Sequence, residues 1–146
     1  IYRYVQKQAT LSGSETSMDF HPDLIDWFDL TSSVSLLTGK TADGNYLPFI
    51  SPSKFMTGVE IELNEVQLKS SYEIHSAQNH SAQFETNTPS YSLIDVSVTK
   101  KIKGVNCELG CNNLMNTVYF DHLSLYKDYG IYNHGRNIYL NLSITF

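Results

Sequence analysis

Residues 136–146 alternate between apolar and polar side chains so regularly that they restrict the fold more than any other stretch of the chain. Successive side chains of a β-strand point to opposite faces, so a period of two predicts a strand. One face would carry Ile138, Leu140, Leu142, Ile144 and Phe146, and the other Tyr139, Asn141, Ser143 and Thr145. A strand that ends on an aromatic residue is more typical of a strand facing lipid than of one completing a soluble core.

The bulk composition excludes several classes of protein. The length of 146 residues suits a single domain over 1–146, and a net charge of −5 without a basic cluster larger than 100–103 argues against a nucleic-acid partner. No apolar run reaches the roughly 18 residues of a membrane helix. Barrel strands need only about 9–11 alternating residues, so a membrane β-barrel is still compatible with the composition.

Cys107 and Cys111 are expected on the same face of one strand. Their Cα atoms would lie about 13 Å apart, beyond the roughly 7 Å that a disulfide spans. We therefore expect no disulfide between them and interpret both as small lipid-facing residues without a redox role. The chain begins at Ile1 in mid-pattern, without a signal peptide or an initiator Met, so we expect a fragment or processed piece of a longer protein.

Similar alternation predicts six further strands, which gives seven in all. Their ranges are 1–20, 24–37, 55–63, 66–76, 92–100 and 105–111, and Ala9 and Leu11 share one side of the first. Short turns are expected at 21–23, at 64–65 and around Gly104, and long polar loops at 39–53, 77–89 and 112–135.

The strict alternation of short and long connections predicts an antiparallel up-and-down meander with all its long loops at one end. Outer-membrane barrels have short turns at one end and longer loops at the other. A Greek-key sandwich would distribute its long connections between both ends. The polar strand faces fit a wet lumen; they carry Glu60, Glu62, Lys69, Glu73 and His75.

Several segments carry a specific resemblance. They are Gly110-Cys111-Asn112-Asn113-Leu114-Met115-Asn116 followed by Tyr119, then Gly135-Arg136-Asn137, and the strand closing on Phe146. This order resembles the C-terminus of TonB-dependent receptors, which end in an N-N-L-F-[ND]-x-x-Y stretch, a loop, G-R and a final strand closing on Phe. Upstream, 9–15 is similar to their A-x-x-x-G-x-E strand and 47–52 to their L-P-x-x-P segment. The sequence departs from the pattern at Met115, Ser51 and His134.

The resemblance implies an all-β chain that supplies the last seven strands of a 22-stranded transmembrane β-barrel with a plugged lumen. The plug domain and the TonB-contacting segment would lie N-terminal to Ile1. The whole protein would be a receptor of the outer membrane of a Gram-negative bacterium. It would take up a scarce nutrient such as a siderophore–iron, metal or cobalamin complex, with no cofactor of its own.

The same resemblance implies the partners and an assembly signal. The partners would be the small-molecule ligand, membrane lipid, TonB, the plug domain and the barrel insertion machinery, which would recognise Phe146. Residues 121–124 with 130–131 and 135–137 further resemble a subgroup associated with metals or metal complexes.

Position on the lumen face and the loops selects the candidate ligand-binding residues. They are His75, His80, Asp121, His122, Tyr126, Tyr129 and His134. Imidazole suits zinc, copper and iron, but no pair of these histidines has ligand spacing on a regular element, so solvated loop histidines are the alternative. Tyrosines form either a stacking surface for a sugar or siderophore or an interfacial girdle; the candidates are Tyr91, Tyr126, Tyr129, Tyr132 and Tyr139.

Two other functions have some support in the sequence. Residues 121–124 contain three residue types of a catalytic triad, but triads are assembled in space and adjacency in sequence does not supply their geometry. We therefore expect no enzyme. The alternative to the receptor is a soluble β-sandwich, a carbohydrate-binding or adhesin module that binds sugars through its tyrosines.

Overall fold

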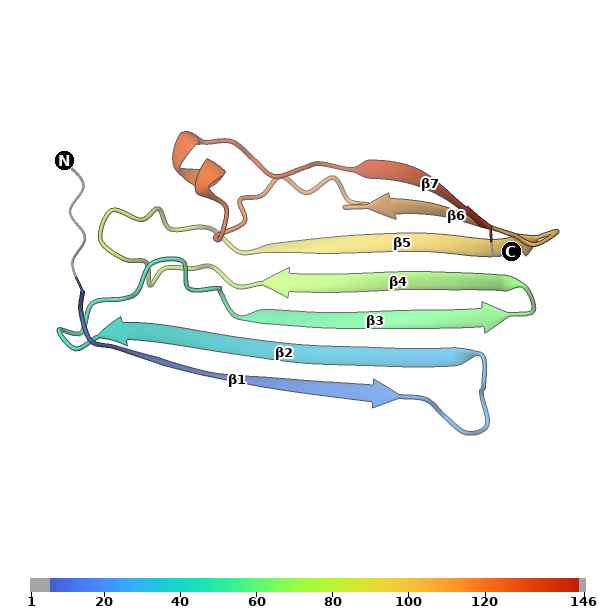
Figure 1. The fold of residues 1–146 in the computed structure, drawn as a ribbon, viewed down its shortest axis with the longest axis horizontal. Helices are drawn as coiled ribbons and strands as arrows, with labels where there is room; N and C mark the ends of the chain where they lie inside the picture. The colour runs from blue at the N-terminus through green and yellow to red at the C-terminus, as the bar shows by residue number, and fades with distance from the viewer. Residues whose placement is uncertain (1–5, 145–146) are drawn as a thin grey trace.

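The structure, a computed structural model, describes residues 6–144 and places seven strands in one antiparallel sheet (Figure 1). The strands are β1 (Ala9–Phe20), β2 (Phe28–Thr41), β3 (Lys54–Leu63), β4 (Val66–His75), β5 (Tyr91–Ile102), β6 (Val105–Asn112) and β7 (Asn137–Ile144). Each strand pairs with its neighbours in sequence, so the predicted meander is confirmed. A 3-10 helix, η1 (Leu125–Tyr129), lies between β6 and β7. Within 6–144 no helix has the length and apolar character needed to span a membrane.

The connections alternate as the sequence predicts. The turns 21–27, 64–65 and 103–104 lie at one end of the sheet, and the loops 42–53, 76–90 and 113–136 lie at the other (Figure 1). Two of the turns contain only two residues and use positive φ angles: 56° at Asn64, and 50° and 85° at Lys103 and Gly104. Positive φ matches the turn to the right-handed twist of the strands, and Asn and Gly adopt it most readily.

Some strand boundaries differ from the prediction. The first connection is longer than 21–23, because the backbone N–H groups of Ile25 and Phe28 bond to the carbonyls of Pro22 and Ile25, and these successive turns delay β2 to Phe28. The terminal residues 1–5 and 145–146, and with them the predicted assembly signal Phe146, lie outside the described residues.

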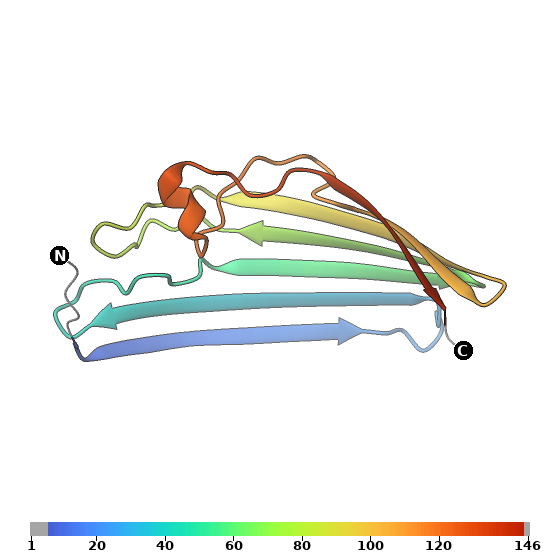
Figure 2. The ribbon, with the colours of Figure 1, turned by 45° about the horizontal axis from the view of Figure 1, so that its top comes forward.

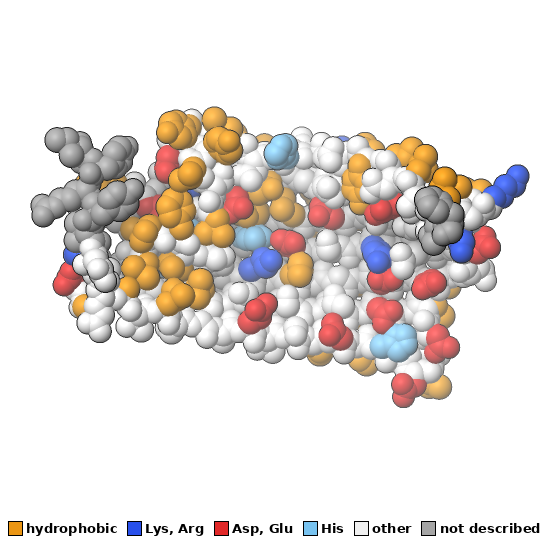
Figure 3. Space-filling view, viewed as in Figure 1, with side chains coloured by type: hydrophobic (Ala, Val, Ile, Leu, Met, Phe, Trp, Pro, Cys, Tyr) orange, Lys and Arg blue, Asp and Glu red, His pale blue; other side chains and the backbone are white. Residues whose placement is uncertain are grey.

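The strand pairs run in continuous register, so the two faces of one strand continue into the next. Every Asp and Glu within the strands falls on one face; they are Glu15, Asp19, Asp29, Glu60, Glu62, Glu73, Asp95 and Glu108. We call this the acidic face, and Figure 3 shows its carboxylates spread over the strands. The predicted wet face of β3 and β4 is part of it.

The opposite face, which we call the apolar face, carries no Asp or Glu within the strands. Its aliphatic and aromatic side chains include Phe28, Leu30, Val34, Leu36, Phe55, Val59, Ile61, Leu68, Tyr72, Ile74, Ile94, Val96, Val98, Leu109, Ile138, Leu140 and Leu142. No hydrophobic side chain within residues 6–144 is buried. Burying one such side chain stabilises a structure by about 1.5–3 kcal/mol, so this face requires an apolar environment.

The sheet is open within the described residues, with β1 and β7 at its two edges (Figure 2). The residues 6–144 form a single sheet, and no second sheet packs against it. The β-sandwich alternative is therefore wrong for this fold, because a sandwich buries the inner faces of two sheets against each other.

The first strand departs from the simple pattern. Leu11 pairs with Gly39 on the acidic face, while much of β1's apolar face carries Ser and Thr. The side chain of Leu11 lies over Gly39, and the side chains of Leu47 and Ile50 from the next loop meet it there. A side chain at residue 39 would collide with these methyl groups, so the glycine permits a small apolar cluster on the otherwise polar side.

Candidate ligand-binding loops and lumen face

Glu85 connects the three long loops at one end of the sheet. Its carboxylate accepts hydrogen bonds from the backbone N–H groups of Phe49 (3.1 Å) and Ala82 (3.2 Å). It also accepts from Lys127 Nζ at 3.0 Å. Phe49, Glu85 and Lys127 belong to three different loops, so one side chain holds all three together.

Glu85, His122 and Lys127 form what we call the loop clamp. The side chains of His122 and Lys127 are each 1% exposed, and that of Glu85 is 7% exposed. Lys127 also donates to the carbonyl oxygen of His122, and its ammonium lies 5.1 Å from the centre of the Phe49 ring. Nε2 of the His122 imidazole lies 3.2 Å from Glu85 Oε1, and Nδ1 on the other side of the ring lies 3.1 Å from Thr88 Oγ1. Buried charges persist in proteins when they are paired in this way.

The surroundings set the ionisation of the clamp. Burial opposes the charge on Glu85, but the hydrogen bonds from Lys127, Ala82 and Phe49 more than offset it and lower the pKa of the carboxyl. Burial, and then the charge of Lys127, lower the pKa of the His122 imidazole. At neutral pH the clamp therefore contains an ionised carboxylate and a neutral imidazole.

The burial of His122 changes its role. We predicted it as a ligand-binding residue, but in this structure its ring packs inside the loop clamp and is not presented to a ligand. No local sequence pattern distinguishes it from an exposed loop histidine, because the side chains next to its ring nitrogens, Glu85 and Thr88, lie more than thirty residues away.

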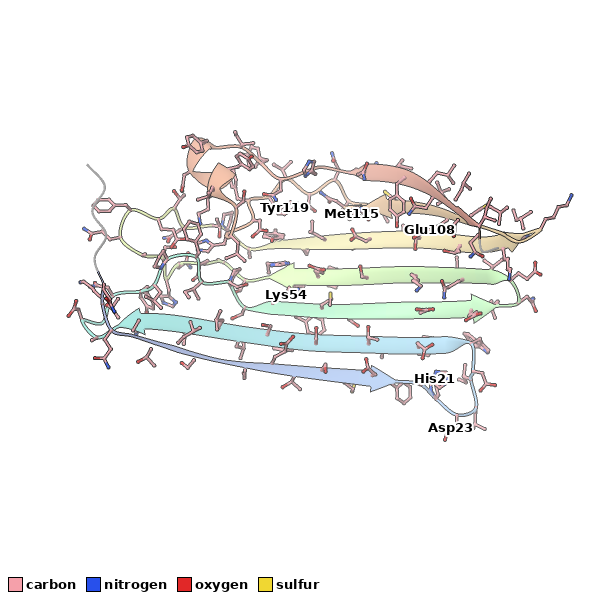
Figure 4. All side chains as sticks on the ribbon, in the orientation of Figure 1. His21, Asp23, Lys54, Glu108, Met115 and Tyr119 are labelled. Carbon is pink, nitrogen blue, oxygen red and sulfur yellow. The ribbon has the colours of Figure 1, made fainter. Side chains whose placement is uncertain are left out.

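His75 begins an aromatic stack on the acidic face near the loops. Its ring lies 4.4 Å from that of Tyr91, and Tyr91 lies 4.4 Å from Tyr119 of the last loop. Figure 4 shows Tyr119 over the loop end of β5. His75 Nε2 lies 3.0 Å from a carboxylate oxygen of Glu73. Burial, and then the Asp121 carboxylate, raise the pKa of the Tyr119 hydroxyl. The stack therefore brings His75 of β4 close to Tyr119, which precedes Asp121 by two residues in the last loop.

The remaining candidate histidines are exposed and lie apart from this stack. His80 stacks on Tyr46, with 4.7 Å between ring centres. His134 borders a hollow of about 650 Å³ that is lined also by Asp95, Tyr119 and Arg136. In the part of the chain that the structure describes, no group of three or more His, Cys, Asp or Glu side chains is arranged to hold a metal ion.

The candidate tyrosines do not form one surface. Tyr126 and Tyr129 are 64% and 80% exposed on η1, and Tyr132 stacks on Phe120 close by. Tyr91 belongs instead to the stack with His75. Tyr139 lies across Gly110 on the acidic face and donates a hydrogen bond to Glu108. The prediction of a shared stacking surface or girdle is therefore wrong for Tyr91 and Tyr139, and an exposed aromatic surface remains on the last loop.

The segment 121–124 has structural roles. Asp121 Oδ1 accepts the backbone N–H of Leu123, and Ser124 Oγ accepts that of Tyr126 and so caps η1. His122 is held in the loop clamp. The Asp, His and Ser side chains are thus engaged in separate contacts rather than in a triad.

Two asparagines of the segment 110–116 have structural roles that the sequence alone did not reveal. Asn113, 4% exposed, bonds through its side chain to the backbone of Thr117 and to the carbonyl of His134. Asn116 Oδ1 accepts the backbone N–H of Arg136. These bonds fix the start of the last loop against its end. In the sequence, only the resemblance of 110–116 to a known motif pointed to these asparagines.

Comparison with known proteins supports the fold. No protein-family model matches the chain, and no curated protein matches its sequence. Among solved structures, the chain is similar to copper transporter OprC, with a TM-score of 0.87 and 18% sequence identity. The match covers 94% of this chain and 23% of that one, so the chain spans about a quarter of the structure it matches.

The match and the topology together define the class of fold. The chain is an all-β antiparallel meander of the kind that forms part of the wall of a β-barrel. The short turns, long loops and separation of apolar and acidic faces all fit such a wall.

Proposed function

We propose that this chain forms wall and loops of a TonB-dependent receptor in the outer membrane of a Gram-negative bacterium. It supplies the last seven strands of a 22-stranded barrel that takes up a scarce nutrient, such as a siderophore–iron, metal or cobalamin complex. The proposal rests on the separation of the two faces of the sheet. Every strand carboxylate lies on the acidic face, and the hydrophobic side chains of the apolar face are not buried. A barrel wall between lipid and a wet lumen requires this division.

Each part of the chain has a role in this proposal. The apolar face contacts membrane lipid, and the acidic face lines the lumen and meets the plug domain, which TonB rearranges to open a path. The open edges at β1 and β7 pair with other strands of the barrel, since unpaired strand edges favour further pairing. Phe146 serves as the assembly signal for the barrel insertion machinery.

The proposed ligand surface lies at the loop end. Tyr126 and Tyr129 offer exposed aromatic area there, and His80 and His134 offer exposed imidazoles. His75 and Asp121 stand at the mouth of the acidic face. The loop clamp keeps these loops in place beneath the ligand.

The experiment is uptake by the full-length receptor of a panel of labelled metal chelates and cobalamin. We expect uptake of at least one compound that stops when TonB is removed. Replacing Tyr126 and Tyr129 by Ser should weaken binding of that compound about tenfold, because two aromatic contacts are lost. Leu24→Ser is the control, since Leu24 is 96% exposed but lies in a turn at the opposite end. Uptake of none of the panel, or uptake independent of TonB, would contradict the proposal.

A further inference from the structure

The apolar face contains a groove that has no part in binding the nutrient. It has a volume of about 480 Å³ and is lined by side chains from β4 to β7, among them Leu68, Val96, Val98, Leu109, Cys111 and Ile138. Cys111 lies opposite both Val96 and Ile138 in the sheet. Its small side chain leaves the hollow between the longer aliphatic residues, and the shape suits a hydrocarbon chain.

Two residues border the groove at its loop end. The backbone N–H of Leu114 bonds to the carbonyl of Ile94 at 2.7 Å, and that of Arg136 bonds to Asn116 Oδ1 at 2.9 Å. Both residues line the groove, and Arg136 also borders the hollow that contains Asp95 and Tyr119. The start of the last loop and its end are therefore fixed together at the groove, and Arg136 directly precedes β7.

Arg136 has no carboxylate partner among the described residues. None of the salt bridges within 6–144 includes it, and the apolar face carries no Asp or Glu within the strands. A guanidinium presents a planar set of donors that matches a carboxylate or a phosphate. An anion bound by Arg136 would therefore come from outside residues 6–144.

The depth of Arg136 indicates which anion. The apolar residues of β7 run from Ile138 to Ile144, about 20 Å at 3.4 Å per residue. Arg136 lies two positions beyond Ile138 and about 27 Å along the strand from Ile144. At a strand tilt of about 40° this is about 21 Å along the membrane normal, near the edge of a hydrocarbon band about 25 Å tall. That edge is on the side of the long loops, which in outer-membrane barrels is the extracellular side. Lipid phosphates of the outer leaflet lie at this level.

We propose that this groove binds an acyl chain of lipid A, the phosphorylated glycolipid of the outer leaflet, and that Arg136 binds its phosphate. The inference rests on the proposed placement of the chain in the outer membrane. The acyl chain occupies the hollow beside Cys111, and the charge-assisted hydrogen bonds of Arg136 select the phosphate. The extracellular position favours lipid A over a glycerophospholipid of the inner leaflet.

The test titrates purified lipid A into the full-length receptor in detergent and counts bound lipid by native mass spectrometry. We expect Arg136→Gln to weaken binding about tenfold and Arg136→Lys to restore much of it, because the lysine keeps the charge. Cys111→Phe should weaken binding as well, since it fills the groove and leaves Arg136 in place. Lys100→Gln is the control: Lys100 is exposed on the same face but near the turns, and binding should be unchanged.

Three outcomes would overturn the lipid site. They are no effect of Arg136→Gln and Cys111→Phe, an equal effect of Lys100→Gln, or phosphatidylglycerol binding as tightly as lipid A. Membrane fractionation of the same protein separates this failure from failure of the proposed function. A receptor found in the outer membrane that shows any of these outcomes lacks the lipid site but keeps its proposed role.

Discussion

Replacing Glu85 by Leu should release the three long loops from one another. The change leaves the ammonium of Lys127 buried at 1% side-chain exposure without its carboxylate, and it removes the acceptor of two backbone N–H groups. Breaking a buried ion pair by removing one partner costs about 3–5 kcal/mol. Amide hydrogen exchange in 76–90 and 113–136 should accelerate by at least about a hundredfold, while exchange in the middle of the strands stays slow.

The matched control is Lys7→Met, which breaks the ion pair between Lys7 and Asp43. These side chains are 51% and 61% exposed, and an exposed pair is worth about 0–1 kcal/mol. Loop exchange in this variant should change by less than about fivefold. Equal effects of the two substitutions would show that the loop clamp does not hold the loops.

Acidification should open the same loops. The pKa of Glu85 is lowered in the folded loops, so the stability it contributes is present above the pKa of the unfolded carboxyl and is lost as pH falls through the folded value. The pKa of His122 is lowered from its ordinary 6.5, so opened loops bind a proton that closed loops exclude, and closure weakens below about pH 6.5. Both groups therefore act in the same direction.

An arginine at Val96 should destabilise the barrel far more than an arginine at the next residue, Ser97. Val96 lies on the apolar face between Ser70 and Cys111, and Ser97 lies on the acidic face between Lys69 and Gly110. A charge on the lipid face near the middle of the bilayer costs about 2–4 kcal/mol, whereas lumen substitutions are tolerated. Denaturant unfolding of the full-length receptor in lipid vesicles measures both costs.

The two variants control for each other, because they add the same side chain to adjacent positions of β5. We expect Val96→Arg to lower the free energy of unfolding by at least about 2 kcal/mol and Ser97→Arg by less than about 1 kcal/mol. The opposite order would mean that the assignment of the two faces is reversed.

The strands and turns could be predicted because their signals are local. The alternation in 55–63 and 66–76 defines both faces, and Asn64 accepts the positive φ that a two-residue turn needs. The first strand was harder to predict, since Leu11 pairs with a glycine and packs on the acidic face with residues of a loop. Tertiary contact there overrides the period of two.

The loop contacts could not be predicted from local pattern. Glu85 and Lys127 are separated by 42 positions, and Thr88 and His122 by 34, so only the folded sheet brings them together. The sequence supplied the residue types of the candidate site, but not which histidines are exposed. His80 and His134 are exposed, whereas His122 is buried in the loop clamp.

Lipid contact along β7 tests the central claim most directly. Nitroxide labels at Leu140, Asn141, Leu142 and Ser143 of the full-length receptor in vesicles would report collision with oxygen, which concentrates in lipid, and with a water-soluble nickel chelate. We predict high oxygen accessibility at Leu140 and Leu142, on the apolar face, and low values at Asn141 and Ser143, on the acidic face. Accessibility without a period of two, or with the two faces exchanged, would contradict a barrel wall between lipid and lumen.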